Sequence, residues 1–500
     1  MKKLIFTVAM LTVLSANAQS LTPENGAKNV CVDTHLTLRF DNPVSAGKSG
    51  KVRVYERPAN GSVADEVLVD SLDLSIPAGP TQSREYGPEC DYTKIPYDYT
   101  RSSVPTNRDT KPGTPSGMAE PTPPEYQLNI IGGFTDAFHF HPVIARGNTA
   151  TIYLHNNILQ YGCTYRITID KSVLNTDGFE GISDWSFEVK KDMPTGVELN
   201  VKADGAGDFC TLQGALDHIP DFSDTHYYIY VGEGDFEELV YVRNKSNVTI
   251  KGAGMDKTKV HYANNEVFNP HPLLVKTNER PGTFPSRRAA VDFDNCRDVA
   301  LRDITFATDL TGQAEGLLLN GEHFDLKNVR IIGSGDALQV NGTIYMEDSE
   351  ILGGTDAILS RGAVFAKHCN FVNDGGPFAW IRNTKSSHGL VFVECTLGTT
   401  NGRPFDFARC PTNKKTTYPD AEMVLINCKA HDVIPSGWSA LGEPTVQMLE
   451  FNTTSTITGN PFDTSNRHAY SRQLDAKKDK KVIQKYSTPK WVLNGWSPKR

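Results

Sequence analysis

Long apolar runs and positive charge are both scarce in this sequence of 500 residues. Beyond the first 20 residues, no stretch approaches the roughly 20 apolar residues that a spanning helix needs, so we expect no membrane span. The formal net charge of −8 argues against a protein that coats nucleic acid or another polyanion. Helical periodicity is scarce too, whereas Gly (41) and Pro (29) are frequent. This balance is typical of an all-β protein.

Two common ligand-binding motifs are also missing. The histidines show no spacing such as H-x-x-x-H, so we expect no metal ion and no other cofactor. The stretch "GAGDFCTLQGALDHIP" begins at residue 205 with a Gly-rich loop ahead of a helical pattern. It lacks both the P-loop lysine and the dinucleotide-binding spacing. We interpret it as a turn and a short helix that caps the end of a β-domain.

The first 20 residues, "MKKLIFTVAMLTVLSANAQS", differ from the rest of the chain. Two lysines, an apolar run and Ala-Asn-Ala ending at Ala18 form the pattern of a secretory signal peptide. We therefore expect residues 1–18 to be removed and the protein to be exported, into the periplasm or the medium. No cysteine follows directly that would carry a lipid anchor.

The next part of the chain, residues 19–192, predicts a β-sandwich. Segments such as "HLTLRF", "GKVRVYE", "CTYRITID" and "DWSFEVKK" alternate polar and apolar residues, as half-buried strands do. A stretch rich in Pro, Ser, Thr and Gly near residues 80–124 interrupts them, which indicates a long insertion. This part resembles the bacterial Ig-like modules found ahead of secreted enzymes, and we see no catalytic grouping in it.

Residues 197–500 contain short β-rich blocks that repeat. Aligning "FDLKNVRIIG", "IYMEDSEILG", "AVFAKHCNFV", "LVFVECTLG" and "MVLINCKAHD" makes five positions equivalent, with steps of 20, 20, 26 and 33 residues. These positions are Val329, Ser349, Cys369, Cys395 and Cys428. A unit of this length with variable insertions is the signature of a right-handed parallel β-helix. The cysteines then form an inward column of free thiols, which Cys296 from an earlier coil is expected to join.

Two aspartates occupy matching places in this repeat. Asp336 follows Val329 by seven residues, and Asp356 follows Ser349 by seven. Adjacent strands lie about 4.8 Å apart, so the two carboxylates should be roughly 5 Å from each other. Such a pair suits an acid and a nucleophile made from identical groups. The alternative is that both aspartates only hold turns between strands.

Several motifs in a fixed order resemble the pectin methylesterases, the family of parallel β-helices that de-esterify methylated polygalacturonate. They are "GAGDFCTLQGAL", "VYVRNKSNVTIKGAG", "GQAEGLLL", "SGDAL", "GTDAILS", "NGRPFDF" and "HDVIPSGW", and they extend over about residues 201–496. The resemblance implies a secreted esterase that acts on pectin or homogalacturonan and releases methanol without a cofactor.

The same resemblance implies the roles of individual residues. Asp356 would be the nucleophile, and Asp336 would be the general acid and then the base. Gln313 would donate to the oxyanion. Arg403 would hold the Asp356 carboxylate in its attacking orientation. Two aromatic residues would form walls for sugar rings, and they are Phe405 and Trp438.

The sequence also departs from the family pattern. Gly335 stands where the family has a second oxyanion glutamine, Gln339 where it has tyrosine, and "AILS" follows Asp356 instead of Phe-Ile-Phe-Gly. A backbone N–H or another side chain would have to replace the lost oxyanion donor, or the substrate has changed.

These departures keep other functions open. One is a catalytically degenerate carbohydrate-binding β-helix, and another is an esterase for a different pectic ester. A lyase would need a calcium site, which we do not find, and an inverting glycosidase would set its carboxylates about 6.5–9.5 Å apart. Oligomeric state, the pattern of de-esterification and the role of the N-terminal part stay open.

Overall fold

The structure is a computed structural model that describes residues 18–58, 60–83, 103, 107–108, 125–135, 137–270, 286–413 and 415–499. The expected signal peptide, apart from Ala18, and most of the expected insertion near residues 80–124 lie outside the described residues. The chain divides into two compact units, one of Met1–Pro77 with His141–Met193 and one of Ala78–Phe140 with Pro194–Arg500. Within the described ranges, the longest helices have seven residues, and none is long and apolar enough to cross a membrane.

The first unit is a β-sandwich, as predicted. One sheet has the order β1 (Ala18–Thr22), β3 (Leu36–Phe40), β8 (Thr149–Ile152), β7 (Val143–Arg146). The other has the order β2 (Ala27–Val30), β11 (Ile182–Val189), β9 (Thr164–Ile169), β5 (Lys51–Arg57), β6 (Val67–Asp73). Buried and half-buried residues alternate along β9 and most of β5, because one face of each sheet points into the core. A short pair, β4 (Ser45–Ala46) and β10 (Leu174–Asn175), lies beside them.

Residues 125–140 differ from the predicted organisation. The sequence assigned them to the sandwich, but they belong to the second unit. The backbone N–H of His139 donates to Asn269 at 2.7 Å, Arg287 donates to the carbonyl of Ala137 at 3.2 Å, and Phe138 packs on Tyr241 with ring centroids 4.1 Å apart. This segment therefore supports the part of the second unit that contains Arg287.

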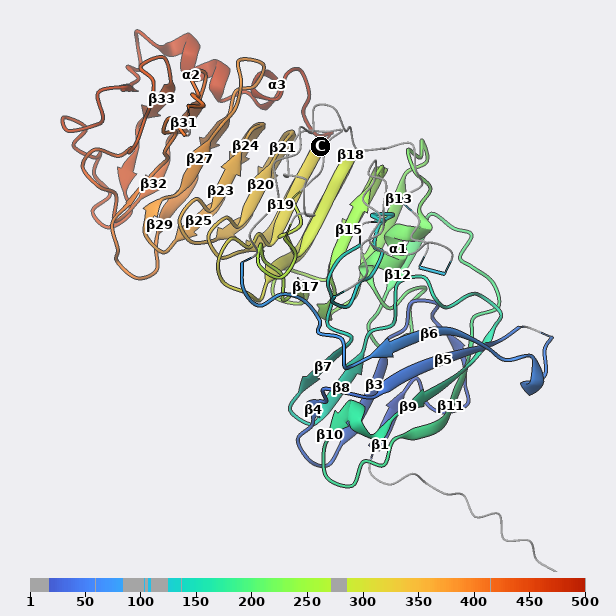
Figure 1. Ribbon diagram of the computed structural model, residues 1–500. Coiled ribbons are helices and arrows are strands. Elements are labelled where there is room, and N and C mark those ends of the chain that lie inside the picture. Colours follow the sequence, from blue (N-terminus) through green and yellow to red (C-terminus); the bar gives the residue numbers. More distant parts are fainter. Residues whose placement is uncertain are drawn as a thin grey trace, which may run out of the picture. The chain divides into compact units, whose positions relative to one another are not determined.

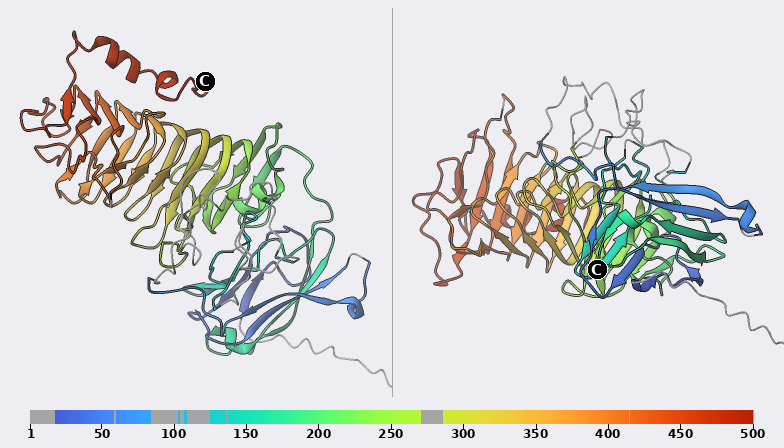
Figure 2. Two further views of the ribbon diagram at one scale, coloured as in Figure 1. Left: turned by 45° about the horizontal axis from the view of Figure 1, so that its top comes forward. Right: turned by 60° about the horizontal axis from the view of Figure 1, so that its bottom comes forward.

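The second unit is a parallel β-helix, as predicted, and Figures 1 and 2 show its stacked coils. Its 22-stranded sheet folds into three faces that share the long strands β18 (Val291–Thr308) and β19 (Leu317–Ile332). The first face also contains β12 (Glu198–Val201), β13 (Tyr227–Val231), β16 (Ser246–Lys251), β21 (Thr343–Glu347), β24 (Ala363–Lys367), β28 (Leu390–Val393), β31 (Glu422–Ile426), β33 (Gln447–Phe451) and β35 (Ser471–Gln473).

The second face adds β14 (Gly234–Glu237), β17 (Thr258–Tyr262), β22 (Glu350–Leu352), β25 (Asn370–Asn373), β29 (Thr396–Thr399), β32 (Lys429–Ala430) and β34 (Thr454–Ser455). The third adds β15 (Val240–Arg243), β20 (Leu338–Val340), β23 (Ile358–Ser360) and β27 (Ala379–Ile381). At the corner between these two faces, β26 (Gly376–Pro377) pairs with β30 (Phe405–Asp406).

The strand register confirms the predicted repeat. Residues that follow the five aligned positions pair in sequence, from Arg330 to Glu350, Asn370, Thr396 and Lys429. The three cysteines of the aligned positions, Cys369, Cys395 and Cys428, are free and buried. The expectation that Cys296 joins their column is wrong, because Ile304 is the residue that pairs with Val329, whereas Cys296 pairs with Gly321.

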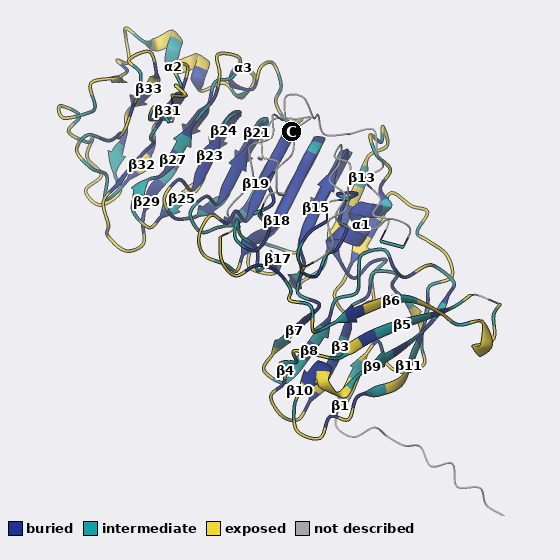
Figure 3. Cartoon of the chain, viewed as in Figure 1, coloured by how far each residue is buried: buried dark blue, intermediate teal, exposed yellow. Residues whose placement is uncertain are grey.

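Helices close the β-helix at two places. The predicted cap is α1 (Leu212–His218), which is almost wholly buried and begins at Thr211, whose side chain accepts from the N–H of Gly214. Helices α2 (Lys480–Tyr486) and α3 (Pro489–Val492) were not predicted, and they cover the outer side of the first face. The strands that these helices cover, such as β24 and β28, are accordingly buried on both sides (Figure 3).

Candidate active site

Two aspartates lie one above the other at the corner between the second and third faces. Leu338 pairs with Ile358, so Asp336 and Asp356, each two residues earlier, occupy the same place on adjacent coils. Strand spacing puts them about 4.8 Å apart along the stack. Both are nearly buried, with 7% and 6% of their surface exposed. Asp356 has a left-handed backbone (φ 62°), a conformation that costs energy and is found most often at functional sites.

An arginine holds Asp356, but it is Arg409. Its Nε donates to both carboxylate oxygens, at 2.8 and 3.2 Å, and its Nη2 donates to Oδ2. The prediction that Arg403 makes this contact is therefore wrong. Arg403 is exposed, and its backbone N–H donates to Asn401 in the turn before β30. A fork of parallel bonds orients the Asp356 carboxylate strongly.

The backbone places Arg409 beside this corner. Arg409 bridges to Trp380 in the preceding coil, and its guanidinium lies over the indole ring, 4.2 Å from the centroid. The sequence contained a signal for this position. "DALQ", "DAIL", "PFAW" and "DFAR" occupy equivalent places on four coils, so Arg409 follows Trp380 in the row that begins at Gln339.

The same repeat reveals a third aspartate in the row. Asp406 is the counterpart of Asp336 and Asp356, two coils beyond Asp356. It is 5% exposed and accepts from the hydroxyl of Ser439 at 2.9 Å. Burial, and more weakly the charge of Asp356, raise the pKa of Asp406 to about 6. The sequence analysis missed this residue.

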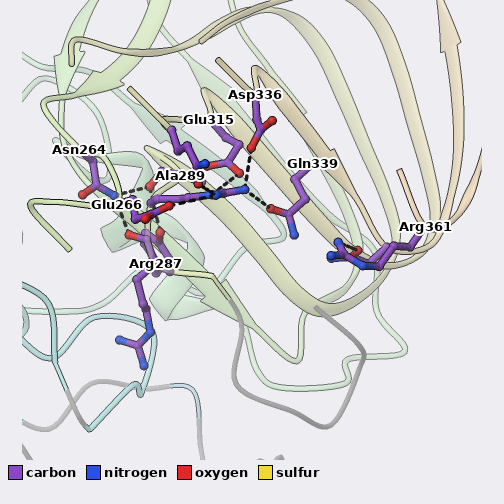
Figure 4. A network of polar contacts seen from close by, with 12 residues as sticks. Asn264, Glu266, Arg287, Ala289, Glu315, Asp336, Gln339 and Arg361 are labelled. Carbon is purple, nitrogen blue, oxygen red and sulfur yellow. Dashed lines mark hydrogen bonds and ion pairs between the residues drawn. The ribbon is translucent and has the colours of Figure 1, made fainter. Parts of the chain in front are cut away.

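Asp336 is held by a second arginine, Arg288, that the sequence analysis also missed. Its Nη2 donates to Oδ2 of Asp336 at 2.7 Å and to Gln339 at 3.4 Å. Its Nε donates to Glu315 at 2.6 Å, and its Nη1 donates to Gln313 at 2.5 Å. Figure 4 shows Glu315, Asp336 and Gln339 gathered around this guanidinium, while the neighbouring Arg287 points away.

Gln313, the predicted oxyanion donor, contacts the same arginine as Asp336. It is exposed, and its side-chain oxygen accepts from Arg288, which leaves the amide nitrogen on the other side. Among the described residues this nitrogen has no hydrogen-bond partner. Two donor protons are therefore available beside Asp336.

The family that these motifs resemble has a glutamine at the position of Gly335. A glutamine side chain would not fit there. The φ of Gly335 is +71°, and a Cβ atom would lie 2.7 Å from the carbonyl oxygen of Gly312. A side chain at this position would thus be strained in its backbone and would clash with a fixed peptide group. The turn has been rebuilt around glycine.

The predicted sugar-contacting aromatics are core residues. Phe405 and Trp438 are both 0% exposed. Trp438 packs on Phe407 with centroids 5.3 Å apart and donates to Glu450 at 3.1 Å. The prediction that these two rings contact substrate is wrong, because both point into the β-helix. Trp380, half-buried beside Arg409, is the aromatic residue next to the aspartates.

One group away from the aspartates has the composition of a metal site. Ligand atoms of Glu237, His261 and Asp309 lie within 4.8 Å of one another. Nδ1 of His261 already contacts Asp309 at 2.5 Å, and its Nε2 contacts Asp235 at 3.1 Å. Both ring nitrogens of His261 thus already have carboxylate partners, so this side chain offers no open ligand atom.

The arrangement at the corner fits acyl transfer. One carboxylate is oriented by a forked guanidinium, a second lies one coil away, and an exposed amide can donate to a developing negative charge. Nucleophile, acid and oxyanion donor are the three parts that ester hydrolysis through a covalent intermediate requires.

Comparison with known proteins identifies the β-helix. The profile of the Pectinesterase family matches residues 198–494, more than half of the chain. Pectinesterase 31 of Arabidopsis thaliana is 27% identical over 219 residues, which cover 42% of this chain and 68% of the relative. Probable pectinesterase 8 of the same plant is 25% identical over 304 residues, which cover 57% and 73%.

Solved structures of similar shape include pectin methylesterases. The enzyme from carrot has a TM-score of 0.48 and 19% identity, with 61% of this chain and 95% of the carrot chain covered. Pectin methylesterase PemA from Erwinia chrysanthemi has a TM-score of 0.47 and 16% identity, with 62% and 99% covered.

Proposed function

Because the chain belongs to the pectinesterase family, we propose that it hydrolyses the methyl esters of galacturonate in pectin through Asp356 and Asp336. The observation that carries the assignment is the stacked pair of aspartates, each with its own arginine. A turn aspartate needs no guanidinium partner, whereas a nucleophile and an acid must each be held in a fixed direction.

In the first half-reaction, Asp356 is the nucleophile. A carboxylate oxygen attacks the ester carbonyl carbon, while Arg409 holds the other side of the carboxylate. Gln313 donates its free amide protons to the oxyanion. The bond from carbon to the methoxy oxygen then breaks, methanol leaves with the proton of Asp336, and an acyl-enzyme on Asp356 is left.

In the second half-reaction, Asp336 acts in reverse. Its carboxylate takes a proton from water, and the hydroxide attacks the acyl carbon. The bond to Asp356 breaks, which restores its carboxylate and releases the galacturonate carboxyl group. Asp336 again carries the proton, so that the sum is ester plus water giving acid plus methanol.

The departures from the family pattern affect which residues contact the substrate. Gly335 offers no side chain, and Ala357, Ile358 and Leu359 after the nucleophile are buried, so none of them replaces an aromatic contact. The half-buried Trp380 supplies the aromatic surface at this corner. We therefore assign sugar contact to Trp380 instead of Phe405 and Trp438.

The test is methanol release from highly methylated homogalacturonan by the purified chain and by Asp356→Asn. Asparagine tolerates the left-handed backbone of this position but cannot attack, so we expect release to fall at least about 10³-fold. The matched control is Asp303→Asn. Asp303 also has a left-handed backbone (φ 54°) and accepts from Asn328, at a corner without the arginines, and its variant should keep its activity.

Two results would contradict the proposal. An equal loss of methanol release in Asp356→Asn and Asp303→Asn would mean that any substitution at a corner lowers the activity, whatever its chemistry. No methanol from a folded wild-type chain would favour the binding protein or the esterase for another pectic ester, and acetate release from acetylated pectin would separate these two.

We also propose that the chain is exported, as its first 18 residues suggest. A polymeric wall substrate lies outside the cytoplasm, which supports the same location.

A further inference from the structure

We propose that Glu315 and Arg288 are positioning residues of this site, and that Glu315 balances the charge of Arg288 so that Asp336 can carry the proton that methanol needs. The inference rests on the proposed function, since it assigns to Asp336 the part of general acid. It adds to the aspartate pair a third carboxyl group that takes part without touching the substrate.

Glu315 belongs to the same row as the two aspartates. Leu317 pairs with Leu338, and Glu315 and Asp336 each stand two residues before the paired leucines. Glu315, Asp336 and Asp356 therefore follow one another on three adjacent coils, at steps of about 4.8 Å. Glu315 differs from the other two in being 0% exposed, so neither substrate nor bulk water reaches it.

Arg288 joins Glu315 to Asp336. Its Nε donates to Oε1 of Glu315 at 2.6 Å and its Nη2 to Oδ2 of Asp336 at 2.7 Å. The same guanidinium fixes the amide of Gln313 through Nη1. One side chain thus connects the buried carboxyl group, the general acid and the oxyanion donor, and Figure 4 shows how Glu315 and Asp336 lie toward each other.

The row holds more acids than bases. Glu315, Asp336 and Asp356 are three carboxyl groups, and Arg288 and Arg409 are the guanidinium groups with which they form ion pairs in the described part of the chain. A fourth acid, Glu266, reaches Arg288 only at 3.4 Å and keeps 44% of its side chain exposed. Buried like charges one strand apart cannot all ionise at once, so the row retains one proton.

Several groups around Glu315 bear on where this proton resides. Burial raises the pKa of Glu315 to about 7, the charge of Arg288 opposes this, and the charge of Asp336 adds to it. Asp292 and Tyr241 also face Glu315, and burial raises the pKa of both well above their usual values. Oε2 of Glu315 is buried without a hydrogen-bond partner among the described residues, as suits a group that alternates between its two forms.

This arrangement solves a problem for the mechanism. A guanidinium beside a lone Asp336 would favour the carboxylate and so remove the general acid. When Glu315 is ionised it compensates Arg288, and Asp336 can hold a proton. When Asp336 gives that proton to methanol, Arg288 stabilises the new carboxylate until water returns a proton to Asp336.

The decisive variants shift the pH profile of kcat in opposite directions. The descending limb at high pH reports loss of the proton from the general acid. Glu315→Gln leaves the charge of Arg288 uncompensated, so we expect this limb to move about one unit to lower pH and kcat at pH 7 to fall about 10-fold, with little change in KM. Arg288→Gln removes the cation and should move the limb to higher pH, although kcat falls because Gln313 is released.

The matched control is Asp325→Asn. Asp325 pairs with Arg302 across adjacent coils on the first face, so its variant loses a carboxylate from an arginine away from the active-site corner. The high-pH limb of the kcat profile of this variant should not move.

The outcomes separate the inference from the function on which it rests. If Glu315→Gln and Arg288→Gln both lower the melting temperature and activity while the limb stays in place, the pair is only structural and the inference fails. Should Glu315→Gln not fold, the direction of the Arg288→Gln shift alone decides, and a shift to lower pH overturns the proposal. The proposed function is tested separately, because the loss of methanol release that we expect for Asp356→Asn does not depend on Glu315.

Discussion

At the scale of single residues, two arginines explain why two chemically identical aspartates can differ in their roles. Arg409 forms a fork with Asp356, and among the described residues it contacts no other acid at hydrogen-bond distance. Arg288 contacts Asp336 with one nitrogen and shares its charge with Glu315. A carboxylate that has a guanidinium to itself is fixed for attack, whereas one that shares its guanidinium can exchange a proton.

Replacing Arg409 should therefore affect turnover more than binding. We expect Arg409→Met to lower kcat about 10²-fold and to leave KM nearly unchanged, because Asp356 loses its orientation and is left buried without a counter-charge. Initial rates of methanol release over a range of pectin concentrations give both constants. Arg403→Met is the control. It removes an exposed side chain, and its kcat should stay within about 2.5-fold of wild type; the reverse ranking would restore Arg403 as the partner of Asp356.

At the scale of the coil, the row of acids is a consequence of the repeat. Each coil brings the same corner back to the same place, so Glu315, Asp336, Asp356 and Asp406 share one position without being neighbours in sequence. The residues at a corner do not have to fill the apolar core, so they can be charged. The strands β20 and β23, which follow this corner on the third face, are wholly buried and hold it rigidly.

Counting along the repeat predicted the site only as far as the spacing was regular. Asp336 and Asp356 stand 20 residues apart, and the register confirms that they occupy the same place on adjacent coils. Between Trp380 and Arg409 the step grows to 29 residues because an insertion leaves the coil, and counting then fails to align "DFAR" with "DAIL". The type of residue also led to a wrong prediction, that of Phe405 as a sugar-contacting residue. Every residue of "FDFA" is buried, so an aromatic residue there gave no sign of which side it faces.

The helices α2 and α3 were missed because their apolar face is short, yet they should contribute measurably to stability. Leu493, at the end of α3, is 1% exposed and lies in a cluster with Phe365, Val391 and Val424 of the first face. We expect Leu493→Ala to lower the free energy of unfolding by about 2–4 kcal/mol, measured by denaturant titration.

A surface residue provides the comparison for that variant. Ile457 is 76% exposed, and Ile457→Ala should change the free energy of unfolding by less than about 0.5 kcal/mol. Equal values for the two variants would mean that α3 does not pack on the first face in solution.

At the scale of the whole molecule, the site reduces the stability of the β-helix at neutral pH. Asp406 and Glu315 are buried, and their pKa values rise to about 6 and about 7. In the unfolded chain both ionise at their ordinary values of 3.8 and 4.5. The native state therefore binds more protons than the unfolded state between these limits, and stability falls as pH rises through this window.

Asp406 allows this cost to be measured without changing the proposed mechanism. A shift of about two pKa units corresponds to as much as about 3 kcal/mol, and this penalty is absent below pH 4 and complete above pH 7. Asp406→Asn cannot ionise and can still accept from Ser439. Its free energy of unfolding should therefore exceed that of wild type at pH 8 and equal it near pH 4. Denaturant titrations of both proteins at pH 4, 6 and 8 give the difference, and a difference that did not grow with pH would show that Asp406 is not held as a neutral acid in the folded chain.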